Sequence, residues 1–213
     1  MKRVFHITIL LVTVVAVFVS CSDKPDDTIE NLKVAIAGET NTNATYLLYS
    51  AKAAEEGYWN INNMFYAAAA AENVHLKNHK DVLKKMGEPD FNPTAVTSPV
   101  NSTADNLQVT IDGEKNEYTE TYPGFIATAK KGKFEDALRS FTLANLAEEN
   151  HEKRFSDVLS ILKENGSDET VPPVWFVCPL CGGMFTNFFS KCGLCFADSE
   201  KQFFDPLRFV AKP

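Results

Sequence analysis

The sequence has only one long hydrophobic run, at its N-terminus, which excludes a polytopic membrane protein. Its 45% hydrophobic and 23% charged residues also exclude low-complexity disorder. Basic residues are not in excess: 21 Lys and Arg against 28 Asp and Glu give a net charge of −7, which argues against a nucleic-acid partner. Histidine and cysteine are scarce, at four and five residues, yet nearly all of them fall into spaced pairs. The chain of 213 residues is long enough for one domain and a small module.

The N-terminus has the pattern of a sorting signal. Met1–Arg3 is basic, and Val4–Val19 is an apolar stretch that is too short and too early for an ordinary membrane-spanning helix. It ends at Ser20-Cys21, and this junction resembles the lipobox of bacterial lipoproteins. The resemblance implies a signal peptide over residues 1–20, acylation of Cys21, an acidic tether over residues 21–27, and a lipid anchor in the bacterial cell envelope, on the periplasmic or outer-membrane face. An uncleaved signal anchor with an incidental cysteine is the alternative.

An internal repeat organises the middle of the chain. The segment at 31–39 recurs at 106–114, an offset of 75 residues, and the segment at 71–77 recurs at 147–153, an offset of 76. We expect a loop between paired helices to absorb the one-residue slip. The repeat predicts a helical hairpin that is present twice.

The stop signals and short connections predict four helices, over about residues 28–56, 60–86, 103–131 and 134–164. A stretch that contains three prolines separates the second helix from the third and is long enough to cross the bundle. The fold class is therefore an all-α four-helix bundle over residues 28–166 with one long crossover, which is the ferritin-like connectivity. Pro123 falls inside the third helix and should kink it.

Both halves of the repeat carry the same pattern of ionisable residues. Residues i and i+3 share a helix face, so a Glu-x-x-His motif offers one carboxylate and one imidazole to the same point in the core. Burying several carboxylates without cations would cost too much free energy, so we favour a dinuclear metal site over a solvated helix face. Such ligands suit iron or manganese. The matched residues are Glu39 and Glu114 on the first and third helices, and Glu72, His75, Glu148 and His151 on the second and fourth.

The two halves are not equivalent. Glu117 follows Glu114 by three residues on the same helix face, whereas its repeat partner is Thr42. A spare carboxylate lets one metal ion change ligands between oxidation states, which suits redox chemistry more than storage. His79 lies one turn after His75, and we expect it on the surface of its helix.

Two tyrosines lie about two turns beyond the lone glutamates, Tyr46 after Glu39 and Tyr122 after Glu114. A buried tyrosine hydroxyl usually has a polar partner, and a metal-bound carboxylate would serve. Packing alone would also place them there.

The C-terminal module, residues 174–213 after a linker at 167–173, holds two Cys-x-x-Cys pairs separated by ten residues. Cys178, Cys181, Cys192 and Cys195 predict a four-thiolate tetrahedral site, because so small a module needs a metal to fold. The spacing does not separate iron from zinc, and two disulfides would form in an oxidising compartment. We expect seven aromatic residues to cover the site: Trp175, Phe185, Phe188, Phe189, Phe196, Phe203 and Phe204.

Together these motifs resemble the rubrerythrin family over residues 28–209. The resemblance rests on Ala37-Gly38-Glu39, Glu72-x-x-His75, Gly113-Glu114-x-x-Glu117, Tyr122-Pro123, Glu148-x-x-His151 and the cysteine pairs. It implies a non-haem di-iron site with the ligands Glu39, Glu72, His75, Glu114, Glu117, Glu148 and His151. It further implies that Tyr46 and Tyr122 hydrogen-bond the carboxylates, and that the four cysteines hold a rubredoxin-type iron in a small β-rich domain.

The activity implied by the resemblance is that of a di-iron peroxidase, which reduces hydrogen peroxide to water in defence against oxidative stress. An unidentified donor protein would supply electrons through the cysteine-bound iron. Family members pair head to tail, so that one chain's cysteine site serves the partner's di-iron site. The second cysteine pair lacks the Pro and trailing Gly of rubredoxin, which leaves zinc open there. The alternatives are an iron-oxidising or iron-binding lipoprotein with a zinc-bound structural module, and a structural lipoprotein with an empty bundle.

Overall fold

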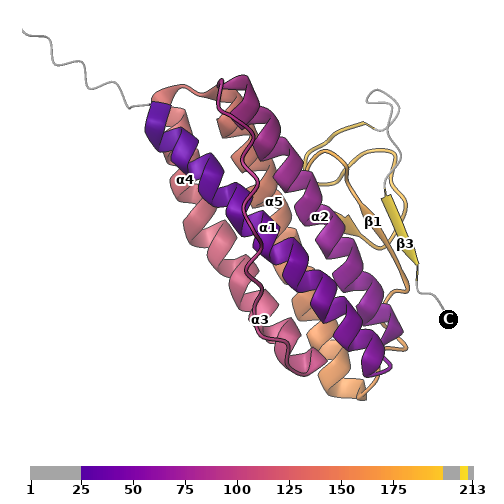
Figure 1. Cartoon of the computed structure of the whole chain (residues 1–213). Helices are drawn as coiled ribbons and strands as arrows, with labels where there is room; N and C mark the ends of the chain where they lie inside the picture. The colour runs from indigo at the N-terminus through magenta and orange to yellow at the C-terminus, as the bar shows by residue number, and fades with distance from the viewer. Residues whose placement is uncertain (1–24, 199–206, 211–213) are drawn as a thin grey trace, which may run out of the picture.

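The computed structural model of the chain describes residues 25–198 and 207–210 (Figure 1). The predicted signal peptide, Cys21 and the start of the predicted tether lie outside this part of the chain, as do Phe203 and Phe204. Among the residues that the structure describes, no helix is long and apolar enough to span a membrane.

The helices form two antiparallel hairpins that pack side by side, which confirms the predicted fold class (Figure 1). The first hairpin is α1 (Pro25–Glu55) with α2 (Trp59–Lys85), and the second is α3 (Thr103–Asn116) and α4 (Tyr122–Gly132) with α5 (Glu135–Asn165). The chain between α2 and α3 has no regular structure and runs along the bundle as the long crossover. Side chains of α1 hold it there: Asn41 Oδ1 accepts a hydrogen bond from the Val96 amide at 2.7 Å, and Thr45 Oγ1 accepts one from the Ser98 amide at 3.2 Å.

A π-helical segment, η1 (Glu117–Thr121), separates α3 from α4. Pro123 follows directly; because it has no N–H and its ring clashes with the carbonyl four residues earlier, regular α-helix cannot continue through it. A π-turn holds one more residue than an α-turn. This residue is the slip in the repeat, so our assignment of the slip to a loop was wrong. The two loops match instead: Tyr58 and Phe134 lie 76 residues apart and share the same N-cap geometry, with φ −90° and ψ 78° against φ −89° and ψ 79°.

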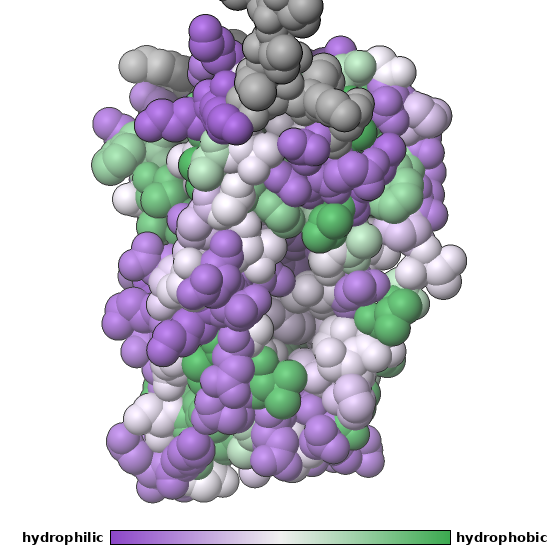
Figure 2. Space-filling model, turned by 90° about the vertical axis from the view of Figure 1, so that its left-hand side faces the viewer, coloured by the Kyte–Doolittle hydropathy of each residue, from purple (hydrophilic) through white to green (hydrophobic). Residues whose placement is uncertain are grey.

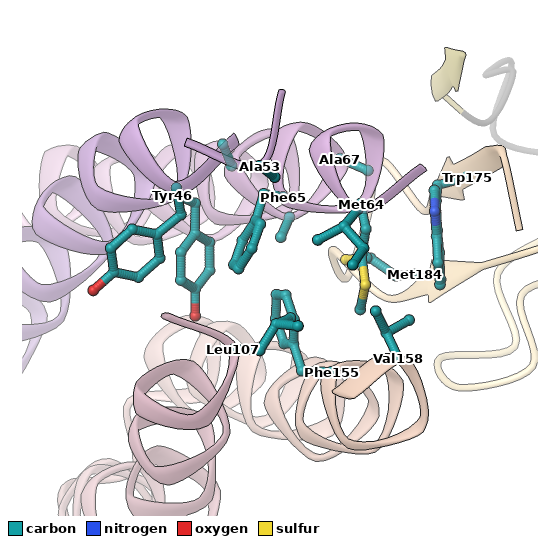
Figure 3. Packing of buried hydrophobic residues seen from close by; sticks show 14 of the residues in the cluster. Tyr46, Ala53, Met64, Phe65, Ala67, Leu107, Phe155, Val158, Trp175 and Met184 are labelled. Atoms are coloured by element: carbon teal, nitrogen blue, oxygen red, sulfur yellow. The ribbon is translucent and has the colours of Figure 1, made fainter. Parts of the chain in front are cut away.

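The C-terminal module packs on α2 and α5 through a three-stranded antiparallel sheet with the order β2-β1-β3. Its strands are β1 (Val174–Val177), β2 (Met184–Phe185) and β3 (Leu207–Val210). Trp175 and Met184 point into the same apolar core as Met64 and Val158 of the bundle (Figure 3). The face of the molecule in Figure 2 is mostly hydrophilic, with hydrophobic residues in small groups.

The aromatic cover expected over the cysteines is only partly present. Trp175 packs on the bundle instead, because alternate residues of β1 face the helices. Phe188 and Phe196 are 63% and 70% exposed. Phe185 and Phe189 do pack beside the cysteines.

The segment between α5 and β1 is fixed to the start of α2. Tyr58, the N-cap residue of α2, makes no side-chain cap hydrogen bond. Asp168 Oδ2 accepts instead from the amides of Asn60 at 2.6 Å and Ile61 at 3.2 Å. A residue about 110 positions away therefore caps α2 and ties the C-terminal module to its own bundle.

We expect Asp168→Ala to lower the free energy of unfolding by about 1–2 kcal/mol, because two N-terminal amides of α2 lose their acceptor. Denaturant titration of the metal-loaded protein measures this. Glu169→Ala, at the exposed neighbouring position, is the control and should change stability by less than about 0.5 kcal/mol. Equal effects of the two variants would contradict the capping role.

Candidate metal centres

Four helices bring the predicted glutamates and histidines of the bundle together. α1 contributes Glu39, α2 contributes Glu72 and His75, α3 contributes Glu114, and α5 contributes Glu148 and His151. They form two groups, in each of which one ligand atom per residue lies within 4.8 Å of the others. The groups are Glu39, Glu72, His75 and Glu148, and Glu72, Glu114, Glu148 and His151. Glu72 and Glu148 belong to both, so each is placed to bridge two ions.

The histidine rings present Nδ1 to the carboxylates. His75 Nδ1 lies 2.9 Å from Glu148 Oε1 and 3.0 Å from Glu72 Oε2. His151 Nδ1 lies 2.8 Å from Glu148 Oε2. The other ring nitrogens face backbone carbonyls of the cysteine module, which fixes Nε2 as the protonated atom and leaves the Nδ1 lone pair for a metal ion.

The buried polar atoms of this site fit two cations. Several of them make no hydrogen bond, among them Glu39 Oε2, Glu72 Oε1, both carboxylate oxygens of Glu148, and His151 Nδ1. Buried polar atoms otherwise have partners almost without exception, so acceptors that converge without donors indicate bound metal. Iron or manganese suits this set of one imidazole and several carboxylates per ion. The chain thus carries the residues of a di-iron carboxylate site.

Without cations the site is electrostatically strained. Burial raises the pKa of the Glu72 carboxyl well above its usual value, and the charges of Glu148 and Glu39 add to the effect. Burial and the charges of Glu148 and Glu72 likewise raise the pKa of Glu114. Burial also works against ionisation of Glu148, but the neighbouring His75 and His151 outweigh it and lower the pKa of Glu148.

Both tyrosines donate hydrogen bonds to carboxylates of the site, each to the one contributed by the other hairpin. Tyr46 on α1 donates to Glu114 Oε1, and Tyr122 on α4 donates to Glu39 Oε1. Both phenols are buried, and burial raises the pKa of each well above its usual value, so both remain protonated donors. The tyrosines thereby orient the two carboxylates that belong to only one group each.

Glu117 lies on the π-helical segment, half-buried and outside both groups. Burial and the charges of Glu39 and Glu148 raise the pKa of its carboxyl well above its usual value. It lines a cavity of about 140 Å³ together with Glu114, Tyr46 and its repeat partner Thr42. The spare carboxylate is therefore beside the groups and reaches them through this cavity.

His79 is buried, so our expectation of a surface histidine was wrong. Its Nε2 lies 3.1 Å from the Tyr122 hydroxyl, and its Nδ1 lies 2.8 Å from Ser140 Oγ on α5. Burial lowers the pKa of the imidazole to about 4. The repeat could have revealed this position, because an offset of 76 aligns His79 with Phe155, an apolar residue on the core face of its helix. Ser140 carried no signal in the sequence.

The four cysteines of the C-terminal module converge on one point. Sγ of Cys178 is 3.8 Å from that of Cys195, and Sγ of Cys181 is 3.7 Å from that of Cys192. All four are free thiols, which excludes the alternative of two disulfides in this structure. Four sulfurs bound tetrahedrally at ~2.3 Å from a metal would be about 3.8 Å apart, so the cluster fits one iron or zinc ion.

The first cysteine loop rests directly on the bundle site. The Cys181 carbonyl accepts a hydrogen bond from His75 Nε2 at 2.9 Å, and the Gly182 carbonyl accepts one from His151 Nε2 at 3.1 Å. Gly182 has a φ of +82°, and a Cβ there would lie 2.3 Å from His75 Nε2. Only glycine permits this approach.

The cysteine site thus contacts the bundle of its own chain, whereas the head-to-tail pairing predicted contact with a partner's bundle. The physical reason is that Asp168 and Trp175 anchor the connecting segment to that same bundle.

Comparison with known proteins agrees with this geometry. The model of the rubrerythrin family matches residues 30–159. Nigerythrin of Nitratidesulfovibrio vulgaris is 36% identical over 175 residues, 81% of this chain and 84% of the relative. Rubrerythrin-2 of Clostridium acetobutylicum is 34% identical over 180 residues, 82% of this chain and 94% of the relative. The structure of fully reduced, all-ferrous nigerythrin superimposes with a TM-score of 0.74 at 33% identity and covers 87% of this chain and 86% of that one.

The fold and the two sites define a ferritin-like di-iron carboxylate protein with a four-cysteine module. The chain belongs to the rubrerythrin family. Membership implies a di-iron oxidoreductase.

We expect the metal-free protein to lose stability as the pH rises from 5 to 8. The pKa values of Glu72, Glu114, Glu117 and His75 are higher in the folded chain than in the unfolded one, so the folded chain binds more protons in this range. Each extra proton held costs about 1.4 kcal/mol per pH unit. Glu148, whose pKa is lowered, contributes nothing to the slope, because it is ionised in both states throughout.

Thermal or denaturant unfolding of metal-free and iron-loaded protein, at pH 5 and pH 8, measures this slope. The loaded protein should not lose stability with rising pH, since the metal replaces the protons. A metal-free protein that is as stable at pH 8 as at pH 5 would contradict the prediction.

Proposed function

We propose that the protein is a rubrerythrin-type peroxidase that reduces hydrogen peroxide to water in defence against oxidative stress. The observation that carries the proposal is the pair of ligand groups that share Glu72 and Glu148 directly beneath the cysteine loop. Two bound ferrous ions would supply one electron each to cleave the O–O bond, and two protons complete two water molecules.

The side chains around the site would hold the ions and keep their coordination asymmetric. Glu72 and Glu148 keep the two ions adjacent, and the hydrogen bonds from Tyr46 and Tyr122 orient the remaining carboxylates. Glu117 is the spare ligand on the cavity side. We propose that it joins the site in one oxidation state only, which would help the site cycle rather than store iron.

The cavity beside Glu114 and Glu117 would admit the substrate. Its volume of about 140 Å³ accommodates a molecule as small as hydrogen peroxide, and its lining offers the Tyr46 hydroxyl and several threonine hydroxyls. Larger organic substrates would not fit.

Electrons would enter through the cysteine site of the same chain. The Cys181 carbonyl and the His75 ring link the two metal sites by one hydrogen bond of 2.9 Å, so the path consists of the Cys181 backbone, this bond and the imidazole. The second link, from the Gly182 carbonyl to His151, is equivalent. An external donor protein would reduce the cysteine-bound iron.

The test uses protein that starts at Ser22, reduced under anaerobic conditions and mixed with hydrogen peroxide, with the metals counted on the same sample. We expect about three irons per chain and a fast return of the visible thiolate-to-iron absorption. A colourless sample with zinc at the cysteines and single-turnover iron oxidation would favour the iron-handling alternative instead.

Gly182→Ala separates the relay from the di-iron chemistry. The added Cβ would strike His75 Nε2 and force the cysteine loop away, so the thiolate absorption should return at least ten times more slowly, while oxidation of the bundle irons proceeds. Gly193→Ala, at an exposed glycine of the second cysteine loop whose Cβ would meet nothing closer than 3.6 Å, is the matched control. Equal return rates in the two variants would contradict this route.

We further propose that the protein is a lipoprotein of the bacterial cell envelope, anchored through Cys21. Support comes from the basic start, the short apolar run and the Ser20-Cys21 junction. In a bacterial host grown with labelled palmitate, the wild-type chain should carry label and sediment with membranes, and Cys21→Ala should do neither. Equal labelling of both would refute the anchor.

A further inference from the structure

Peroxide reduction consumes protons as well as electrons, and the ligands that face the two ions are buried. The structure contains a row of three side chains that leads outward from Glu39. It consists of Tyr122 on α4, His79 on α2 and Ser140 on α5. No role for the last two in the proposed function has been given so far.

The donor and acceptor order of this row follows from its inner end. A carboxylate ligand can only accept, so Tyr122 donates its hydroxyl proton to Glu39. The Tyr122 oxygen must then accept from His79 Nε2–H, at 3.1 Å. A neutral imidazole protonated at Nε2 accepts at Nδ1, and Ser140 Oγ–H lies there at 2.8 Å. Every donor therefore points toward the metal site.

The outer end of the row reaches a surface pocket. Ser140 lines a pocket of about 170 Å³ at the junction of α2, α5 and the cysteine loop. Charged groups surround its mouth, among them Asp81, Lys85, Asp136 and Arg139. Lys85 and Asp136 form an exposed ion pair of 3.0 Å there, which keeps the mouth hydrated. Solvent in this pocket can replace a proton that Ser140 gives up.

The other half of the repeat provides an internal comparison. At the same offset of 76 residues, Tyr122 corresponds to Tyr46, His79 to Phe155 and Ser140 to Met64. The Phe155 ring lies 5.6 Å from that of Tyr46, within the apolar core (Figure 3). Tyr46 thus holds its carboxylate with no polar group behind it. A tyrosine at this position needs no histidine to pack well, so His79 and Ser140 are not required for packing alone.

We propose that Ser140, His79 and Tyr122 form a proton relay from the surface pocket to Glu39, which serves one side of the di-iron site. The inference rests on the proposed function, because that reaction requires protons. In one transfer the Tyr122 proton passes to Glu39, the His79 Nε2 proton to Tyr122, the Ser140 proton to His79 Nδ1, and a solvent proton to Ser140. Each bond broken is matched by one formed, no group in the row changes its net charge, and the hydroxyls and the ring then reorient.

The kinetic test compares wild type with His79→Phe, which copies the other half, and Ser140→Ala, which leaves His79 in place. Iron-loaded, reduced protein is mixed with hydrogen peroxide in H₂O and in D₂O. We expect bundle oxidation to slow about 100-fold in His79→Phe and about 10-fold in Ser140→Ala, and the solvent isotope effect of the wild type to change in both. Ser160→Ala, an exposed serine on the same helix, is the matched control and should match wild type.

A second readout needs no turnover. In protein labelled with ¹⁵N-histidine and loaded with zinc, the ¹⁵N spectrum shows which ring nitrogen of His79 carries the proton. We expect protonated Nε2 and bare Nδ1, with Ser140→Ala moving the Nδ1 resonance and Tyr122→Phe moving the Nε2 resonance.

The two proposals fail in different ways. Wild-type protein that is not oxidised by peroxide would refute the proposed function. Fast wild-type oxidation that is unchanged in rate and isotope effect in His79→Phe and Ser140→Ala would overturn the relay and leave the peroxidase intact. A His79 proton on Nδ1, donated outward to Ser140, would also overturn it.

Discussion

The burial of four glutamates around two histidines is the constraint on which the rest of the structure depends. Glu39, Glu72, Glu114 and Glu148 are each at most 2% exposed, and each comes from a different helix. Ionised carboxylates at such depth require cations, since burial and mutual repulsion both act against them. The bundle is therefore assembled for metal binding, and its stability without metal depends on protons that take the place of the ions.

The same requirement explains the close docking of the cysteine module. Each ligand histidine must present Nδ1 inward, so its Nε2–H needs an acceptor outside, and the first cysteine loop supplies two carbonyls. That loop can approach only because residue 182 is glycine. One set of contacts thus closes the bundle site, fixes both histidine tautomers and joins the two metal sites. The Asp168 cap and the Trp175 packing keep this arrangement within one chain.

Most of the helical fold and the two ligand sets were predictable from the sequence, because both rest on spacing. The offsets of 75 and 76 residues paired the hairpins, and i, i+3 spacing placed each carboxylate beside its histidine. Features that depend on one helix meeting another were not predictable. His79 on α2 is buried because Tyr122 on α4 and Ser140 on α5 meet it. Trp175 turned toward the bundle because the module has no core large enough to bury it.

The π-turn shows how the two halves of one repeat can take different roles. It adds one residue between Glu114 and Tyr122, so the spacing that binds metal on α3 and the spacing that holds Glu39 from α4 are set independently. The segment itself carries Glu117 to the cavity, where the first half has only Thr42. The half that lacks the insertion places Phe155 behind its tyrosine, and the half that has it places His79 and Ser140 there. A site that moves electrons and protons needs such asymmetry, because substrate and protons must reach it from different sides.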